Sequence, residues 1–232
     1  KSANVLIDAE GEKAFCAGGD INALYSTGKT GNFDYARTFW ADEYRLNAKI
    51  AAFPKPYVAL MDGIVMGGGV GVSAHGSHRI VTEKTMLAMP ECGIGLIPDV
   101  GGTWLLAHAP GRIGEYLGLT GARIGAADAM YAGFADTFVP SDKLDALKAR
   151  LLATGDVSCI TEFAAQPPAG DLANIANEIE TAFSGSSIPE IADALGDMDA
   201  EWAGKAAKAV SKTVENVGKA EAELASARVT IT

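Results

Sequence analysis

The stretch at residues 89–102 reads Met-Pro-Glu-Cys-Gly-Ile-Gly-Leu-Ile-Pro-Asp-Val-Gly-Gly and carries two carboxylates, Glu91 and Asp99, among glycine, proline and aliphatic residues. Such neighbours solvate a charge poorly, so we expect both acids to lie in a wall of low dielectric constant. Desolvation raises the pKa of a carboxylate, which suits a group that takes and returns protons near neutral pH. The residues alone leave an alternative: a solvated loop in which Asp99 caps a helix that starts near Val100.

Composition excludes several classes of function. The chain has 232 residues, 48% hydrophobic and 21% charged, which fits a large globular domain with room for an appendage. No sequence run approaches the roughly 18 apolar residues of a membrane span. A net charge of −10 disfavours a nucleic-acid surface but leaves room for an anionic small ligand where lysines and arginines gather. The three cysteines have no metal-like spacing, which favours a reducing compartment, and His75 and His78 are expected to be structural.

Two glycine-rich turns can bind an oxygen anion through their backbone N–H groups. The first, residues 13–20, ends in Asp20, which can cap a helix over residues 21–25. The second contains Gly67-Gly68-Gly69 between a strand at residues 57–61 and a helix of small residues at 72–75. Because it joins a strand to a helix start, it is the stronger anion signal. It lacks the Lys-Ser/Thr ending of a P-loop, which argues against nucleotide triphosphate hydrolysis.

The pattern of apolar residues predicts an α/β fold followed by a helical C-terminal region. The predicted strands are residues 5–7, 57–61, 79–82, 86–89 and 136–139. The predicted helices are residues 21–25, 33–52, 72–75, 102–106, 111–119, 127–132, 141–152 (capped by Ser141), 172–183, 190–195 and 201–227. After Pro167-Pro168 the composition shifts to Ala, Glu, Asp and Lys, so we divide the chain into a core at residues 1–155 and a helical region at residues 156–232.

Several motifs, in this order, resemble the crotonase (enoyl-CoA hydratase/isomerase) superfamily, and within it the 3-hydroxyisobutyryl-CoA hydrolases. They are Lys-Ala-Phe-Cys-Ala-Gly-Gly-Asp-Ile (13–21), Glu-Tyr-Arg-Leu-Asn (43–47), Lys-Pro-Tyr-Val-Ala-Leu (55–60), Met-Gly-Gly-Gly-Val-Gly-Val-Ser-Ala-His-Gly (66–76), Thr-Glu-Lys (82–84), residues 88–102 and Leu-Thr-Gly-Ala-Arg (119–123). The resemblance implies a crotonase-like core of stacked ββα units. The superfamily's first strand and helix and its C-terminal Glu-Gly-Val-Arg-Ala segment are not in this sequence, and residues 206–217 fit its pattern poorly.

The resemblance also implies roles for individual residues. The N–H groups of Gly19 and Gly68 would form an oxyanion hole for the thioester oxygen, and Glu91 and Asp99 would carry the catalysis. Glu43, which position on its helix alone would leave exposed, would contact the acyl part together with Gly68. The substrate-binding set is completed by Lys13 and Ala17, which would lie near the CoA arm. No metal is expected, and coenzyme A enters as part of the substrate rather than as a cofactor.

Position 71 favours hydrolysis over hydration. Hydratases of this superfamily carry a glutamate there as the partner of the Pro-Glu glutamate, whereas this chain has Gly71. We therefore expect a thioester hydrolase for a short 3-hydroxyacyl-CoA such as 3-hydroxyisobutyryl-CoA in valine catabolism, with Glu91 as general base or as nucleophile. The alternatives are an enoyl-CoA isomerase or hydratase and a non-catalytic acyl-CoA binder. Related proteins assemble through C-terminal helices, which allows a homo-oligomer, and the expected location is the cytoplasm or the mitochondrial matrix.

Overall fold

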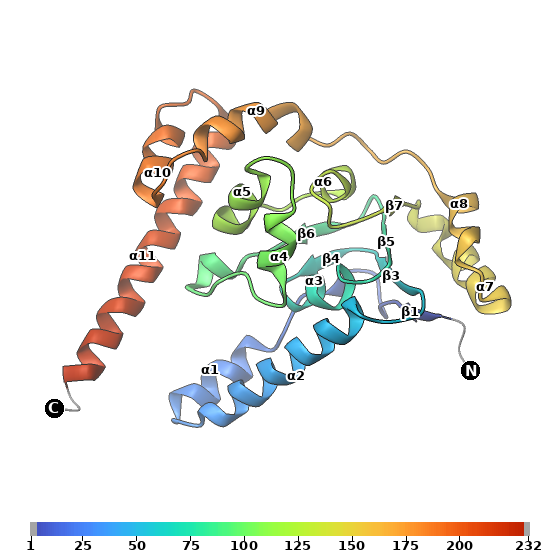
Figure 1. Ribbon diagram of the computed structural model, residues 1–232, viewed down its shortest axis with the longest axis horizontal. Helices are drawn as coiled ribbons and strands as arrows, with labels where there is room; N and C mark the ends of the chain where they lie inside the picture. The colour runs from blue at the N-terminus through green and yellow to red at the C-terminus, as the bar shows by residue number, and fades with distance from the viewer. Residues whose placement is uncertain (1–3, 230–232) are drawn as a thin grey trace.

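The computed structural model describes residues 4–229, with side chains up to Lys219, and is built on two parallel sheets (Figure 1). The larger sheet has the strand order β1-β3-β5-β7 and the smaller one β2-β4-β6. The strands are β1 (Val5–Ile7), β2 (Ala14–Cys16), β3 (Tyr57–Met61), β4 (Ile64–Met66), β5 (His78–Val81), β6 (Met86–Ala88) and β7 (Thr137–Phe138). All pairings within both sheets are parallel.

The chain builds this core from repeating pairs of strands, each followed by helical structure. The first strand of each pair joins the larger sheet and the second joins the smaller one. The helical segments between or after the pairs are α1 (Ile21–Lys29), α2 (Phe33–Ala51), α3 (Gly68–Ser73), η1 (Glu91–Ile94), α4 (Gly102–Ala107), α5 (Ile113–Thr120) and α6 (Ala126–Tyr131). This arrangement confirms the predicted α/β core of stacked ββα units.

The larger sheet is buried on both faces, as expected for parallel strands. Successive side chains of a strand point to opposite faces, and β3 shows this directly. Ala59 and Met61 join the main hydrophobic core, whereas Val58 and Leu60 face a second cluster. That second cluster is covered by α7 (Leu144–Thr154), which follows η2 (Ser141–Lys143), and by η3 (Val157–Cys159) and α8 (Ile160–Phe163). Helices α7 and α8 lie at the end of the molecule away from α11 (Glu201–Val229) (Figure 1).

The C-terminal helices complete the main core. They are α9 (Leu172–Ala182), α10 (Ile188–Gly196) and α11 (Glu201–Val229). Buried side chains of all three, including Ile179, Leu195 and Val210, belong to the same cluster as the sheets. In addition, Asn216 Nδ2 of α11 donates a hydrogen bond to Gly93 O of η1 at 2.9 Å. The division at residue 155 therefore stays a prediction, and α11 helps to hold the loop that carries Glu91.

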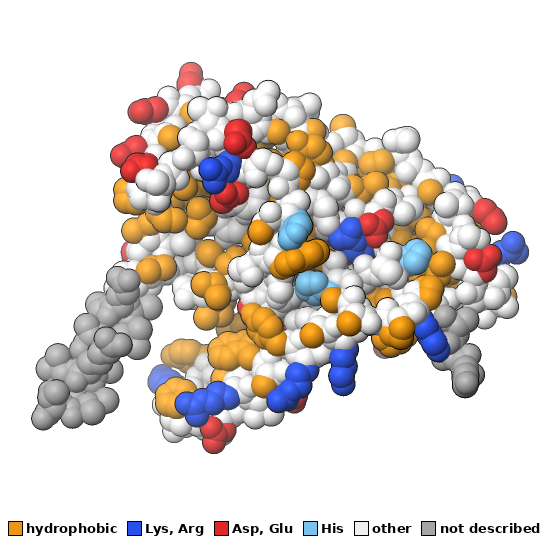
Figure 2. Space-filling view, viewed as in Figure 1, with side chains coloured by type: hydrophobic (Ala, Val, Ile, Leu, Met, Phe, Trp, Pro, Cys, Tyr) orange, Lys and Arg blue, Asp and Glu red, His pale blue; other side chains and the backbone are white. Residues whose placement is uncertain are grey.

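The surface near the α1–α2 hairpin is both apolar and basic. In Figure 2, hydrophobic side chains gather where this hairpin meets the rest of the molecule, and Lys and Arg side chains line its outer side. On α2, Arg37 and Arg45 each pair with an aspartate one helical turn earlier, Asp34 and Asp42. Within the described residues, no helix is both long and apolar enough to cross a membrane.

Several local features differ from the prediction. Strands β2 and β4 were not among the predicted strands, one cap and one helix start differ, and the alternative for Asp99 is wrong as well. Ser141 does not cap the helix that follows, because its N–H and hydroxyl both donate to the carboxylate of Glu83. Asp99 caps no helix either, since α4 begins at Gly102 after Gly101. The helix of small residues starts at Gly68 rather than at residue 72, so the glycines themselves form its first turn. Asp20 does cap α1, accepting from Ala23 N at 3.1 Å.

Candidate active site

One pocket of about 110 Å³ brings together the predicted oxyanion and acidic residues. It lies between the ends of β2 and β4, helix α2 and the loop that contains η1. Its lining comprises Ala17, Gly18, Gly19, Ile21, Leu24, Phe39, Trp40, Glu43, Gly67, Gly68, Pro90, Glu91, Ile94, Leu96 and Asp99. Segments separated by up to about eighty residues of chain therefore converge on one small, largely apolar space.

The two glycine turns meet at the pocket wall. A Cβ placed on Gly68 would lie 2.9 Å from Glu43 Oε1, 3.4 Å from Gly18 Cα and 3.5 Å from Gly19 N, so the two turns lie against each other beside the Glu43 carboxylate. Gly68 is the first residue of α3, where helical N–H groups have no partner within the helix. Among the described residues, neither Gly19 nor Gly68 donates its N–H to a protein acceptor. Both donors are thus free for an oxygen of a ligand.

Glu91 is the most perturbed acid of the site. Its side chain is 5% exposed, and among the described residues Oε2 has no hydrogen-bond partner. Burial is the main cause that raises its pKa to about 7; its own backbone N–H opposes the rise, while the charges of Asp99 and Glu43 add to it. Oε1 lies so close to Gly67 that a Cβ there would be 3.0 Å away. A carboxyl group with such a pKa can accept and return a proton near neutral pH.

Asp99 and Glu43 complete a group of three acids. Burial raises the pKa of Asp99, and burial followed by the charge of Asp99 raises that of Glu43. Glu43 is half-buried rather than exposed, because α2 carries it into the pocket beside Gly68. No lysine or arginine lines the pocket to neutralise these charges. As expected from their apolar neighbours, Glu91 is buried and Asp99 is half-buried, and their catalytic roles stay predictions.

Position 71 has no room for a second catalytic glutamate. A Cβ on Gly71 would lie 2.6 Å from Val100 Cβ and 2.8 Å from Asn47 Nδ2. Val100 is fully buried and has φ +48°, a left-handed conformation that costs a β-branched residue about 1–3 kcal/mol. Asn47 is 5% exposed and, within the described residues, neither polar atom of its carboxamide has a partner. The side chains of Val100 and Asn47 thus close the space that a hydratase would give to its second acid.

Two predicted contacts lie at the margin or outside this pocket. Ala17 lines the pocket and is exposed. Lys13 is exposed at the start of β2 and does not line it, so its contact with CoA stays a prediction. Conversely, Phe39 and Trp40 line the pocket, although no sequence motif marked them as site residues. Their spacing of four and three residues from Glu43 places all three on one helix face, which is the signal that could have identified them.

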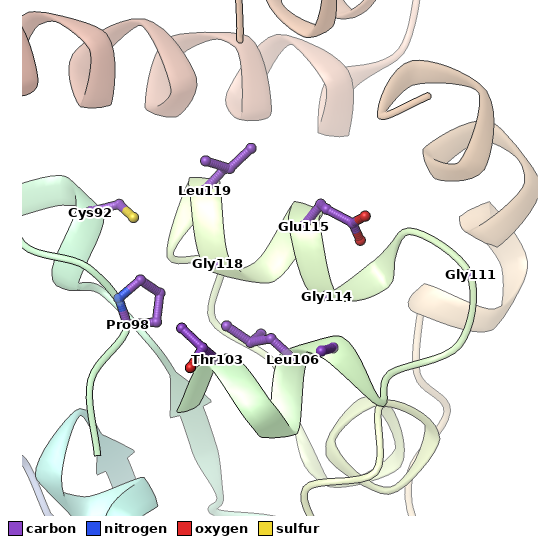
Figure 3. A pocket seen from close by; sticks show the side chains of 10 residues that line it. Cys92, Pro98, Thr103, Leu106, Gly111, Gly114, Glu115, Gly118 and Leu119 are labelled. Atoms are coloured by element: carbon purple, nitrogen blue, oxygen red, sulfur yellow. The ribbon is translucent and has the colours of Figure 1, made fainter. Parts of the chain in front are cut away.

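A second hollow lies between helices α4 and α5 and the loop at residues 92–98 (Figure 3). Its volume is about 450 Å³, and Cys92, Pro98, Leu106 and Leu119 are among its lining residues. Cys92 follows Glu91 in the chain but borders this other space, and burial followed by the charge of Glu91 raises its thiol pKa. All three cysteines are free. No group of three or more His, Cys, Asp or Glu side chains suited to a metal ion occurs in the described part of the chain.

Comparison with known proteins identifies the family. Residues 1–223 match the profile of the family described as enoyl-CoA hydratase/isomerase. The chain belongs to the enoyl-CoA hydratase/isomerase family. Among curated relatives, the zebrafish (Danio rerio) protein named 3-hydroxyisobutyryl-CoA hydrolase, mitochondrial, is 42% identical over 219 residues, which cover 90% of this chain and 57% of the relative. The chicken (Gallus gallus) protein of the same name is 52% identical over 149 residues, 64% of this chain and 38% of the relative.

Solved structures of the family share the fold. An enoyl-CoA hydratase from Rhodobacter sphaeroides matches with a TM-score of 0.83 and 51% identity, covering 89% of this chain and 60% of that one. A carnitinyl-CoA dehydratase from Mycobacterium thermoresistibile matches with a TM-score of 0.88 and 47% identity, covering 94% and 66%. The chain thus has the crotonase fold, and it spans little more than half the length of the zebrafish relative.

Proposed function

We propose that this protein hydrolyses the thioester of a short 3-hydroxyacyl-CoA, with 3-hydroxyisobutyryl-CoA as the first substrate to test. The observation that carries the proposal is the closure of position 71 by Val100 and Asn47, while Glu91, Asp99 and Glu43 surround the pocket. Addition of water to a double bond uses two acids placed for one proton each, and the usual second position is filled here. The names of the zebrafish and chicken relatives support the same reaction.

In the proposed reaction, the thioester oxygen accepts hydrogen bonds from the N–H groups of Gly19 and Gly68. These donors stabilise the negative charge that develops when the carbonyl carbon is attacked. Glu91 takes a proton from water as the water attacks, and Asp99 orients that water. The C–S bond then breaks, and the proton held by Glu91 passes to the departing CoA sulfur. In the second version, Glu91 attacks the carbonyl carbon directly and the C–S bond breaks, so that CoA leaves as a thiolate that takes a proton from solvent. Water then opens the mixed anhydride and frees Glu91.

The pKa of Glu91 suits either version. With a pKa of about 7, the carboxylate is half ionised near neutral pH and basic enough to accept a proton from water in the transition state. The same value makes the protonated form a competent acid for the leaving thiolate. No metal or further cofactor takes part in this proposal, since coenzyme A arrives with the substrate.

The size and polarity of the pocket favour a short hydroxylated acyl group. A space of about 110 Å³ accommodates a branched four-carbon acyl chain more readily than a long one. In this proposal, the carboxylate of Glu43, which lies beside Gly68, accepts a hydrogen bond from the 3-hydroxyl group. Phe39, Trp40 and Leu24 supply apolar contacts for the methyl and methylene groups.

Enoyl-CoA isomerisation is the second candidate. It needs one acid to move a proton between two carbons, and Glu91 with the two N–H donors would suffice. The names of the solved relatives, an enoyl-CoA hydratase and a carnitinyl-CoA dehydratase, favour testing it. It leaves Asp99 and Glu43 without a role, which is why hydrolysis is preferred. A binder without turnover would retain CoA thioesters intact.

The test is release of free CoA from 3-hydroxyisobutyryl-CoA, followed with a thiol reagent, for the wild type, Glu91→Gln and Glu83→Gln. We expect Glu91→Gln to abolish release, because a neutral amide can neither accept the proton nor attack. Glu83→Gln is the matched control, since Glu83 is exposed and bound to Ser141 outside the pocket. Absence of release by the wild type, with turnover of crotonyl-CoA or a 3-enoyl-CoA, would overturn hydrolysis.

We further propose a role in valine degradation, which follows from the substrate above. The zebrafish relative is named as mitochondrial, which supports the matrix location for a eukaryotic chain, while a cytoplasmic location stays the proposal for a bacterial one. An acyl-CoA is the proposed partner, without nucleic acid or membrane. A homo-oligomer stays a prediction, which light scattering of the purified protein would check.

A further inference from the structure

The residue after Asp99 adopts an unusual conformation. Among residues 4–229, Val100 is the one non-glycine residue with a positive φ, at +48°. Its side chain is fully buried and lies beside Gly71. A β-branched residue keeps this conformation only where its surroundings hold it. The contacts around Val100 therefore control the direction of the preceding residue, Asp99.

His75 makes the most direct of these contacts. Its Nε2 is 2.7 Å from the carbonyl oxygen of Val100, so this nitrogen carries the hydrogen and donates it. The ring also covers Gly101, where a Cβ would lie 2.7 Å from Nε2. His75 follows α3, whose first residue is Gly68. The segment at residues 68–75 thus carries the N–H of Gly68 at its start and, just past the end of α3, the ring of His75 that binds the loop at residues 99–101.

Tyr44 of α2 lies near the same residue. The N–H of Val100 lowers the Tyr44 pKa, against a larger rise caused by burial. Tyr44 is the neighbour of Glu43 in the chain. Val100 is consequently held at its carbonyl by His75, and its side chain packs beside Gly71.

We infer that His75 is a positioning residue, whose hydrogen bond to Val100 O holds Asp99 in the pocket opposite Glu43 and Glu91. This inference rests on the proposed function for its kinetic consequence, but its structural part concerns the three acids alone. The acids facing Glu91 are Asp99 from the same loop and Glu43 from α2. Removal of the clamp releases Asp99, whose charge then raises the Glu91 pKa less.

Two substitutions separate the hydrogen bond from the space that the ring fills. His75→Phe keeps a planar ring and removes the donor. His75→Gln places an amide N–H close to the position of Nε2 and is the conservative rescue. The matched control is His108→Phe, because His108 Nδ1 is also 2.7 Å from a backbone carbonyl, that of Trp104, and His108 lines none of the pockets described above.

The first measurement follows the side-chain carboxyl carbon of Glu91 by NMR against pH in the ligand-free protein labelled with carbon-13. We expect the Glu91 pKa to fall in His75→Phe, to return toward the wild-type value in His75→Gln, and to be unchanged in His108→Phe. An unchanged Glu91 titration in His75→Phe overturns the inference. This readout needs no substrate, so it decides the matter even if the protein hydrolyses no thioester.

The second measurement is the rate of CoA release. A misplaced catalytic group can cost up to about a hundredfold, so we expect kcat in His75→Phe to fall about tenfold or more with KM changed less than about twofold. His75→Gln should recover most of the loss. An equal fall in His75→Phe and His108→Phe would point to general destabilisation and overturn the inference. No release by the wild type would instead overturn the proposed function.

Discussion

The acids of the pocket and the acids at the starts of helices show opposite behaviour of the same functional group. At the start of α10, Glu190 accepts hydrogen bonds from Ser186 N at 2.8 Å and Ser186 Oγ at 3.0 Å, and these lower its pKa. In the pocket, burial raises the pKa of Glu91, Asp99 and Glu43, and Oε2 of Glu91 has no partner in the described part of the chain.

The difference is not a lack of donors in the pocket. Two N–H groups, those of Gly19 and Gly68, lie in the same pocket as the three acids, yet they bond to none of them in the described structure. At a helix start, donor and carboxylate satisfy one another and both lose reactivity. In the pocket, they are kept apart, so each is available to a substrate. The unpaired groups of the pocket lower the stability of the fold, whereas the paired groups at the helix starts raise it.

The largest expected effect concerns the unpaired donor. Gly68→Pro removes the N–H while proline remains acceptable at the first position of a helix. We expect kcat for CoA release to fall about a hundredfold to a thousandfold, as for loss of one oxyanion donor. Gly68→Ala is the control, since it adds a Cβ near Glu43 but keeps the N–H. Equal rates for the two variants would remove Gly68 from the oxyanion hole.

The next effect concerns the unpaired acid and has a defined sign with pH. Because folding raises the Glu91 pKa from 4.5 to about 7, its contribution to stability is present below pH 4.5 and is lost as pH rises to about 7. Over this pH window, the free energy of unfolding of the wild type should fall by on the order of 3 kcal/mol relative to that of Glu91→Gln. Urea unfolding of both proteins at several pH values measures this. The rate of CoA release should change in the other direction and rise as the pH passes about 7. If stability depends on pH in the same way in the wild type and in Glu91→Gln, the assigned pKa is contradicted.

A smaller effect tests the closure of position 71. Gly71→Ala places a Cβ 2.6 Å from Val100 and should destabilise the fold by about 1–3 kcal/mol. Gly28→Ala is the matched control, because Gly28 also lies in a helix and a Cβ there meets nothing within 4 Å. Alanine should stabilise that helix by about 0.5–1 kcal/mol. Thermal unfolding measures the stability of both variants. A Gly71→Ala variant as stable as the wild type would contradict the closure of position 71.

The smallest effect comes from a satisfied acid outside the pocket. Burial alone would raise the Glu83 pKa, but the hydroxyl and N–H of Ser141 outweigh it and the net pKa is lowered. Glu83→Gln should cost less than about 1 kcal/mol, since Glu83 is exposed and water competes for its partners. The rate of CoA release should equal that of the wild type. A loss of activity comparable with Glu91→Gln would contradict the contrast between the two kinds of acid.

Much of the fold could be predicted because local patterns agree with the tertiary structure. The β3 strand, five consecutive buried residues, and the long α2 helix were both located from apolar patterns. Predictions from neighbouring residues were wrong where a side chain had more than one possible hydrogen-bond partner. Ser141 has the chemistry of a helix cap, but Glu83, 58 residues away in the chain, supplies a charged acceptor instead. Nothing in the neighbouring sequence indicates that choice.

The sequence by itself determined the family, the glycine turns and the identity of the acids, because these depend on residue types at short spacings. Only the tertiary structure decided that Glu43 is half-buried beside Gly68, that Lys13 lies outside the pocket, and that Val100 and Asn47 close position 71. The raised pKa of Glu91 was likewise decided only by the tertiary structure. It depends on burial and on acids from another helix, and a low dielectric environment exists only once distant segments have packed together.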